Sequence, residues 1–152
     1  MICIKRIVFS GIYFFFILTN YYFIFKNYHL FIFLKPSIIF YSFINLLFCL
    51  GYLSLFYSYF LICKVFNFEY LKDYYKYLIT DFISFVFFII NLFLIKDLFA
   101  TFIFILTSLI STILLYYESK FLYKLYSLFI LPNIFIKLYA AILVIIIHFM
   151  NL

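Results

Sequence analysis

The stretch ITDFISFVFFIINLFLI, Ile79 to Ile95, places one aspartate and one asparagine in an almost unbroken run of Phe, Ile, Leu and Val. An apolar helix of about 20 residues is long enough to cross the hydrocarbon core of a bilayer. The stretch therefore predicts a membrane-spanning helix. It also raises the question of what holds Asp81 and Asn91 at that depth.

The composition of the whole chain agrees with a membrane protein. Of its 152 residues, 71% are hydrophobic and 11% are charged, and the mean hydropathy is +1.29. A soluble domain carries about 25% charged residues. There is too little polar material here to cover a water-facing surface, so the sequence predicts one integral membrane domain over residues 1–152.

The distribution of apolar runs predicts an all-α, polytopic transmembrane bundle. Strands are disfavoured because an open sheet in lipid would leave backbone groups unpaired at its edges. Residues 64–78 and 118–131 are expected to lie along the membrane surface as connectors. About five spans are expected, at residues 7–25, 37–63, 79–95, 98–117 and 132–151.

The basic residues predict the orientation of these spans. Cytoplasmic or matrix loops of membrane proteins carry an excess of Lys and Arg. With five spans, eight basic residues fall on the side of the N-terminus and three on the other, which predicts a matrix or cytoplasmic N-terminus. The first group is Lys5, Arg6, Lys64, Lys72, Lys76, Lys120, Lys124 and Lys137, and the second is Lys26, Lys35 and Lys96.

Four residues are candidates for an intramembrane polar site or proton path: Asp81, Asn91, Lys137 and His148. Asp81 is expected near a helix N-terminus, close to water, and Asn91 is expected to hydrogen-bond a neighbouring helix. Lys137 is expected either to extend back to the membrane surface or to pair with Asp81, if the third and fifth spans are neighbours. A proton path along these residues is the functional alternative.

Small and hydroxyl residues line one face of the second span and one face of the fourth. Such residues let helices approach closely in lipid, so both faces are interpreted as packing seams. No motif predicts a catalytic, cofactor-binding or metal-binding site, and the three cysteines lack CxxC spacing. The two faces consist of Gly51, Ser54 and Ser58, and of Thr101, Thr107, Ser108, Ser111 and Thr112.

The residue choice indicates an extremely A/T-rich gene, because Phe and Tyr number 27 and 17 whereas Gly and Pro number two each. Such a chain resembles the hydrophobic respiratory-chain subunits encoded in protist mitochondrial DNA, and its five expected spans resemble subunit 6 of NADH–ubiquinone oxidoreductase. LITDFISFVFFIINLFL and ATFIFILTSLISTILLYY are similar to the two later spans of subunit 4L. In that comparison Asp81 stands for the first membrane carboxylate and Thr112 for the second.

The resemblance implies a subunit of a respiratory complex of the mitochondrial inner membrane, foremost the membrane arm of NADH dehydrogenase. Its partners would be other hydrophobic subunits and lipids, without nucleic acid, and its role would be structural or part of a proton path. The alternatives are a structural subunit of cytochrome c oxidase or ATP synthase, or a stand-alone small transporter, with a bacterial plasma membrane as the alternative location.

Overall fold

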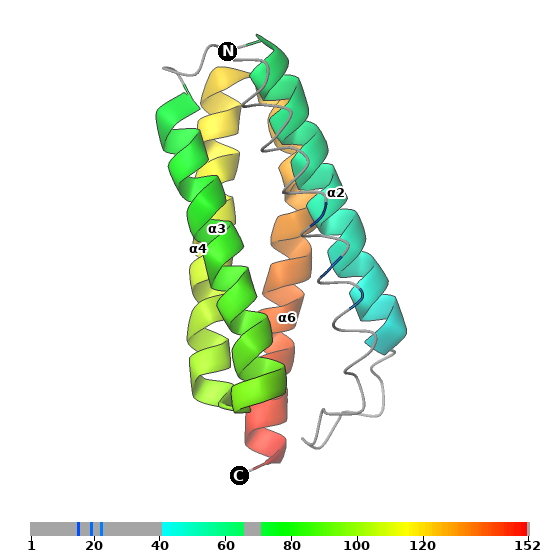
Figure 1. Ribbon diagram of the computed structural model, residues 1–152. Coiled ribbons are helices and arrows are strands. Elements are labelled where there is room, and N and C mark those ends of the chain that lie inside the picture. The colour runs from blue at the N-terminus through cyan, green and yellow to red at the C-terminus, as the bar shows by residue number, and fades with distance from the viewer. Residues whose placement is uncertain (1–14, 16–18, 20–21, 23–40, 66–70, 152) are drawn as a thin grey trace.

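The computed structural model describes residues 41–65 and 71–151, together with Phe15, Thr19 and Tyr22. No strand occurs within these residues. The helices alternate in direction along the bundle (Figure 1). In chain order they are α2 (Tyr41–Val65), α3 (Lys72–Ile90), the π-helix η3 (Asn91–Ile95), α4 (Leu98–Leu122), α5 (Lys124–Ser127), the 3₁₀-helix η4 (Leu128–Ile130) and α6 (Leu131–Met150).

Four helical runs are long and apolar enough to cross a membrane, which confirms the predicted transmembrane helical bundle. The first predicted span, residues 7–25, lies outside the described residues except for Phe15, Thr19 and Tyr22. The four runs are Leu46–Val65, Lys72–Ile95, Leu98–Leu122 and Lys124–Met150.

Two predicted connectors prove to be largely helix. α3 begins at Lys72 rather than at Ile79, and α4 continues to Leu122 rather than ending at residue 117. Tyr123 alone is extended, after which α5, η4 and α6 follow without a surface segment. The predictions for residues 72–78 and 118–131 were wrong because hydropathy marks the hydrocarbon layer, whereas helical hydrogen bonding continues into the charged headgroup region.

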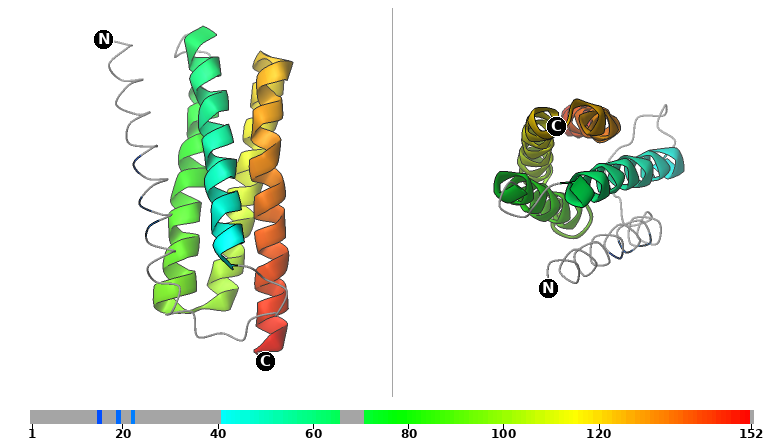
Figure 2. Two further views of the ribbon diagram at one scale, coloured as in Figure 1. Left: turned by 90° about the vertical axis from the view of Figure 1, so that its right-hand side faces the viewer. Right: turned by 90° about the horizontal axis from the view of Figure 1, so that it is seen from above.

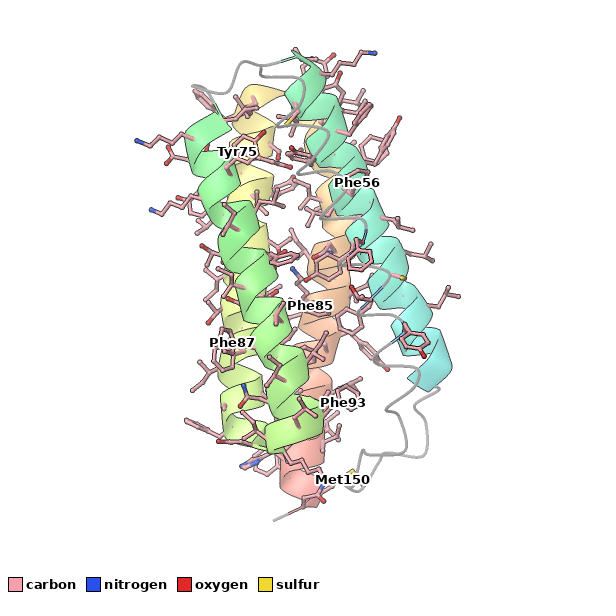
Figure 3. The ribbon with its side chains drawn as sticks, in the orientation of Figure 1. Phe56, Tyr75, Phe85, Phe87, Phe93 and Met150 are labelled. Carbon is pink, nitrogen blue, oxygen red and sulfur yellow. The ribbon has the colours of Figure 1, made fainter. Side chains whose placement is uncertain are left out.

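The helices surround a common interior. α4 packs against both α3 and α6, and α2 packs against α6 (Figure 2). Between α2 and α3 the contact is made by aromatic rings. The ring centre of Phe85 on α3 lies 5.4 Å from that of Phe48 and 4.7 Å from that of Tyr52, both on α2. Figure 3 shows Phe85 pointing into the space between the helices. The interior of the bundle is therefore enclosed by all four long helices.

A tight turn connects α3 to α4. Lys96 adopts a left-handed conformation with φ of 63°, and its backbone N–H donates to the Asn91 carbonyl. Asp97 then caps α4, because its side chain accepts a hydrogen bond from the Ala100 N–H at 3.0 Å. This turn makes α3 and α4 an antiparallel hairpin, which fixes the level of each residue on α4 relative to α3.

The second-span face is a packing seam, as predicted for Gly51. A Cβ atom on Gly51 would lie 2.7 Å from Ile136 Cδ1 and 3.4 Å from Asn133 Cα, so α2 and α6 approach closely there. Farther along α2, the Ser58 hydroxyl donates to the Tyr126 carbonyl at 2.9 Å. Ser54 instead bonds to Gly51 of its own helix. Small residues thus bring α2 against the last transmembrane run.

Candidate functional site

A lysine and an aspartate meet inside the bundle. Asp81 comes from α3 and Lys137 from α6, and their side chains are 1% and 0% exposed. The Lys137 ammonium donates to Asp81 Oδ1, which makes the one ion pair among the described residues. A charged side chain at membrane depth costs about 2.5–3.5 kcal/mol on insertion scales. Pairing leaves this centre with no net charge.

Helix α4 supplies two hydroxyl groups to the pair. Ser108 Oγ donates to Asp81 Oδ1 at 2.5 Å, and Lys137 Nζ donates to Thr112 Oγ1 at 2.6 Å. The Thr112 hydroxyl donates its own proton to the Ser108 carbonyl at 2.9 Å. The proton of Thr112 is thereby committed to the backbone, so its oxygen faces Lys137 as an acceptor.

Helix α2 contributes an aromatic face. Lys137 Nζ lies 4.9 Å from the centre of the Tyr52 ring, which is 3% exposed. A ring face attracts a cation through its quadrupole, and the attraction strengthens where water is excluded. Lys137 is therefore held by a carboxylate, a hydroxyl and a ring from three different helices. We call Tyr52, Asp81, Ser108, Thr112 and Lys137 the ion-pair layer.

The two oxygens of the Asp81 carboxylate differ. Oδ1 accepts hydrogen bonds from both Ser108 and Lys137, whereas Oδ2 is buried and has no hydrogen-bond partner in the part of the chain that the structure describes. An ionised carboxylate offers about four acceptor positions, so the lone pairs of Oδ2 are open. This oxygen is the place where the centre can accept a further proton or bond a water molecule.

The structure brings together two of the four predicted site residues. The pairing of Asp81 with Lys137, predicted as one possibility, is present, and the alternative in which Lys137 extends to the surface is wrong. Asp81 is also not near a helix end, because α3 begins at Lys72 and Asp81 lies about 13 Å along it. The error followed from starting the third span too late.

Asn91 and His148 lie away from this centre. The Asn91 amide donates to the Phe87 carbonyl of its own helix at 2.8 Å, so the predicted bond to a neighbouring helix is wrong. His148 lies in the last turn of α6, partly exposed, with its ring 6.1 Å from that of Phe149. On the same helix it is about 16 Å from Lys137.

Sequence reasoning did not count Ser108 and Thr112 among the candidate site residues and assigned both to a packing seam, although the comparison with subunit 4L gave Thr112 the place of the second membrane carboxylate. A signal for Thr112 was present. The number of residues from Asp81 to Lys96 equals the number from Asp97 to Thr112. Asp81 and Thr112 are therefore equally far from the turn, on opposite arms of the hairpin, and lie at the same level. Ser108 lies one turn farther along the same face of α4.

Comparison with protein-family models, with curated proteins and with solved structures finds no match. Within the described residues, no group of three or more His, Cys, Asp or Glu side chains is placed to hold a metal ion. Cys49 and Cys63 form no disulfide. The ion-pair layer itself supplies an acid, an amine and hydroxyl groups.

Proposed function

We propose that the chain is a multi-pass subunit of a respiratory-chain complex of the mitochondrial inner membrane, in the membrane arm of NADH dehydrogenase. In this proposal the Asp81–Lys137 pair holds a proton within the membrane. The observation that carries it is a fully buried pair of titratable groups whose carboxylate keeps one open oxygen. Intramembrane ionisable groups of this kind characterise proton relays.

Stability alone is a weak reason for such a pair. Taking two charges out of water is costly, and well-packed apolar residues of similar volume often stabilise a protein as much or more. Asp81 and Lys137 nevertheless have hydrogen-bond partners on α4 and a ring on α2, so the surroundings are arranged around the charges. That arrangement favours a task for the charges over a packing role.

The resemblance to subunit 4L supports the choice of complex. In that comparison the two membrane carboxylate positions correspond to Asp81 and Thr112. Both side chains contact the same atom, Lys137 Nζ. The two positions therefore belong to one centre, in which Lys137 supplies the charge that balances Asp81. A stand-alone transporter is disfavoured because α2, α3 and α4 contain no proline and the proline of α6 lies in its first turn, whereas broken helices are typical of transporter sites.

Extraction of the tagged protein from its native membranes in mild detergent tests the proposal. On a native gel we expect the tag to migrate in a large complex that also stains for NADH dehydrogenase activity. The same tag fused to an unrelated membrane protein serves as the control for non-specific association. Migration of the protein alone, as a monodisperse small species, would favour the transporter.

A further inference from the structure

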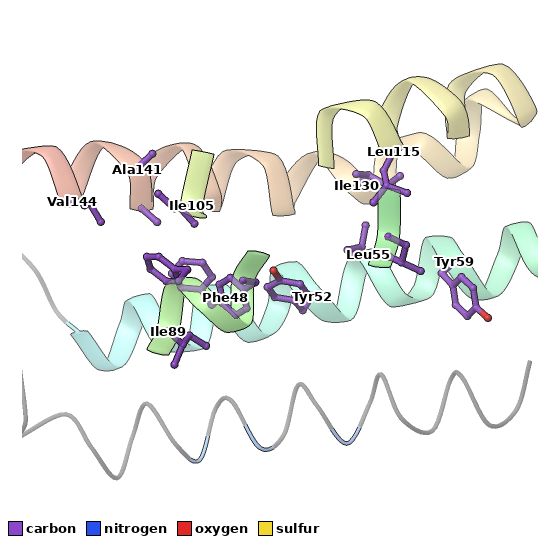
Figure 4. Close-up of a cluster of buried hydrophobic side chains, with 14 of the residues drawn as sticks. Phe48, Tyr52, Leu55, Tyr59, Ile89, Ile105, Leu115, Ile130, Ala141 and Val144 are labelled. Atoms are coloured by element: carbon purple, nitrogen blue, oxygen red, sulfur yellow. The ribbon is translucent and has the colours of Figure 1, made fainter. Parts of the chain in front are cut away.

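The interior of the bundle is built in layers on both sides of the ion-pair layer. Figure 4 shows Tyr52 lying between two groups of buried apolar side chains. We call the end of the bundle where α2 stops at Val65 and α3 starts at Lys72 the basic end. The apolar group on that side of Tyr52 contains Leu55, Leu115 and Ile130, and Tyr59 lies beyond this group.

The spacing of residues repeats on three helices. On each helix, a leucine lies three residues from the member of the ion-pair layer, in the direction of the basic end. A side chain with a hydroxyl group lies four residues farther in the same direction. One helical turn separates each step, so the residues stack on the same inward face. The three series are Asp81, Leu78 and Tyr74 on α3, Thr112, Leu115 and Ser119 on α4, and Tyr52, Leu55 and Tyr59 on α2.

The leucines in the middle of these series, together with Ile130 of η4, form a barrier of aliphatic side chains. Leu55, Leu78, Leu115 and Ile130 are all between 0% and 1% exposed. We call these four residues the aliphatic layer. It is about one helical turn thick, and on α2, α3 and α4 it separates the ion pair from the next buried polar side chains, whereas on α6 the buried Asn133 lies between Ile130 and Lys137.

Beyond the aliphatic layer, buried hydroxyl groups gather from three helices. Ser58, Tyr74 and Ser119 are at most 1% exposed. The Tyr74 hydroxyl interacts electrostatically with those of Ser58 and Ser119, and neither it nor Ser119 Oγ has a hydrogen-bond partner among the described residues. Buried polar groups in this condition are commonly satisfied by an internal water. We call these three residues the hydroxyl layer.

The opposite side of the ion pair is different. There the interior is filled by Phe48, Phe85, Phe88, Ile105 and Val144, each at most 9% exposed. The ring centres of Phe85 and Phe88 are 5.6 Å apart, and those of Phe48 and Phe85 are 5.4 Å apart. The buried polar side chains on this side are those of Ser84, Asn91 and Thr101. Among the described residues, none of these three has a buried polar atom without a partner, in contrast to Tyr74 and Ser119 of the hydroxyl layer.

We propose that water and protons reach Asp81 from the basic end only, through the hydroxyl layer, with the aliphatic layer as the gate. The inference rests on the proposed proton-holding role of the pair. When the gate hydrates, an O–H bond breaks in a hydronium ion, which leaves as water, and an O–H bond forms at Asp81 Oδ2. Lys137 keeps its protons, so the charge of the centre rises from zero to plus one.

Silver ions can test the direction of access, because Ag⁺ travels in water and bonds to thiols. Ser108→Cys would place a thiol beside Asp81 in a background where Cys3, Cys49 and Cys63 are changed to Ser. Sealed membrane vesicles containing the assembled protein are exposed to Ag⁺ from one side at a time. The free thiol that remains is measured after denaturation. Lys72→Cys identifies the side of the basic end.

We expect Ser108→Cys to react with Ag⁺ from the basic end and not from the opposite side. Leu115→Ser should speed that reaction about tenfold, because a hydroxyl replaces an isobutyl group in the barrier. The matched control is Ile105→Ser, which alters an equally buried residue of α4 in the aromatic block. It should not open a reaction from the opposite side.

Reaction of Ser108→Cys from the opposite side, or equal rates from both sides, would overturn the inference. So would a reaction from the basic end that Leu115→Ser does not accelerate. If a serine variant is lost from the membrane, Leu115→Thr and Ile105→Thr provide a milder pair. The reaction with Ag⁺ requires no pumping activity. Co-migration with NADH dehydrogenase tests the proposed function, whereas the Ag⁺ reaction tests one-sided access, so either proposal can fail while the other holds.

Discussion

At the scale of single residues, the main feature of the molecule is a lysine buried inside a membrane-spanning bundle, where burial of a charge is unfavourable in free energy. Lys137 directs its ammonium to the carboxylate of Asp81, the hydroxyl of Thr112 and the ring of Tyr52, and none of its side chain is exposed. Removing either charge would leave the other buried and unbalanced. The loss of one partner from a buried pair is accordingly more damaging than the loss of both.

This asymmetry gives the first prediction. Asp81→Asn should lower the free energy of unfolding by about 3–5 kcal/mol, since it leaves the Lys137 ammonium uncompensated. The double variant Asp81→Asn with Lys137→Met should recover most of that loss, because a flexible apolar chain fills the same path. Thermal unfolding of the detergent-solubilised protein measures both changes.

The same variants separate packing from proton transfer. If the double variant assembles and keeps fully coupled proton pumping, the pair is only a structural device and the proton-holding role is wrong. Restored assembly with reduced pumping would support the role. Ser111→Ala is a suitable control, because Ser111 is a buried hydroxyl residue of α4 for which the structure shows no bond to the pair.

The pair could be predicted from the sequence, but its surroundings were not. Asp81 and Lys137 are conspicuous because charges are scarce in apolar runs. Ser108 and Thr112 are not conspicuous, because hydroxyl residues on transmembrane helices generally form packing seams. Their role depends on the level of α4 relative to α3, which follows from the Lys96–Asp97 turn. The contact between the Tyr52 ring and Lys137 depends on where α2 packs. No short turn in the sequence fixes that position in the way the Lys96–Asp97 turn fixes α4 relative to α3.

At the scale of the elements, helix ends and close contacts determine how the bundle is assembled. The apolar runs predicted which segments are transmembrane, but the charged ends of α3 and α4 were mistaken for connectors. Charges at a helix end do not interrupt its backbone hydrogen bonds, so hydropathy underestimates helix length. Consequently the positions of Asp81 and Lys137 along their helical runs were also misjudged.

The contact between α2 and α6 gives the second prediction. Gly51→Ala should change stability by less than about 1 kcal/mol, because the new methyl group meets the flexible end of Ile136, which can rotate. Gly51→Val should cost more, because its branches would also press on the Asn133 backbone and separate the helices. Thermal unfolding of the two variants gives the comparison, with the exposed Leu53→Val as control. Equal losses for alanine and valine would contradict a close-approach role.

The hairpin turn gives the third prediction. Asp97→Ala removes the side-chain acceptor of the Ala100 N–H and should destabilise the protein by about 0.5–2 kcal/mol. Asp97→Asn should be nearly neutral, since asparagine caps a helix about as well as aspartate. The matched pair distinguishes capping from charge in a thermal unfolding experiment. A large loss for Asp97→Asn would show that the charge of Asp97, rather than the cap, is what stabilises the turn.

At the scale of the whole molecule, a neutral polar centre lies within an apolar exterior. Large apolar side chains are exposed on every long helix, among them Phe99 at 67%, Phe121 at 89% and Phe135 at 66%. In a bilayer such residues face lipid or neighbouring subunits, so exposure here is not a defect of packing. The exterior is thus consistent with the expected lipid and subunit partners.

The charges at the two ends of the bundle give the last prediction, which concerns orientation. Lys137 no longer counts as a surface residue, because it is buried between the helices. Among the described residues, the end of the bundle that starts α3 still carries Lys64, Lys72, Lys76, Lys120 and Lys124, whereas the other end carries Lys96. The excess predicts that the first end lies on the matrix or cytoplasmic side.

Cysteines introduced for Lys72 and Lys96 measure this orientation. α3 starts at Lys72, and Lys96 follows the π-helix that ends this run, so the two positions lie at opposite ends of one span. A membrane-impermeant thiol reagent should therefore label them from opposite sides, with Lys72→Cys labelled from the matrix or cytoplasmic side. Lys120→Cys should label together with Lys72→Cys, because α4 returns to that end. Labelling of Lys72→Cys and Lys96→Cys from the same side would mean that this helix does not cross the membrane. Opposite labelling with the sides exchanged would leave the bundle intact but place the gate toward the other compartment, and protons would then reach Asp81 from there.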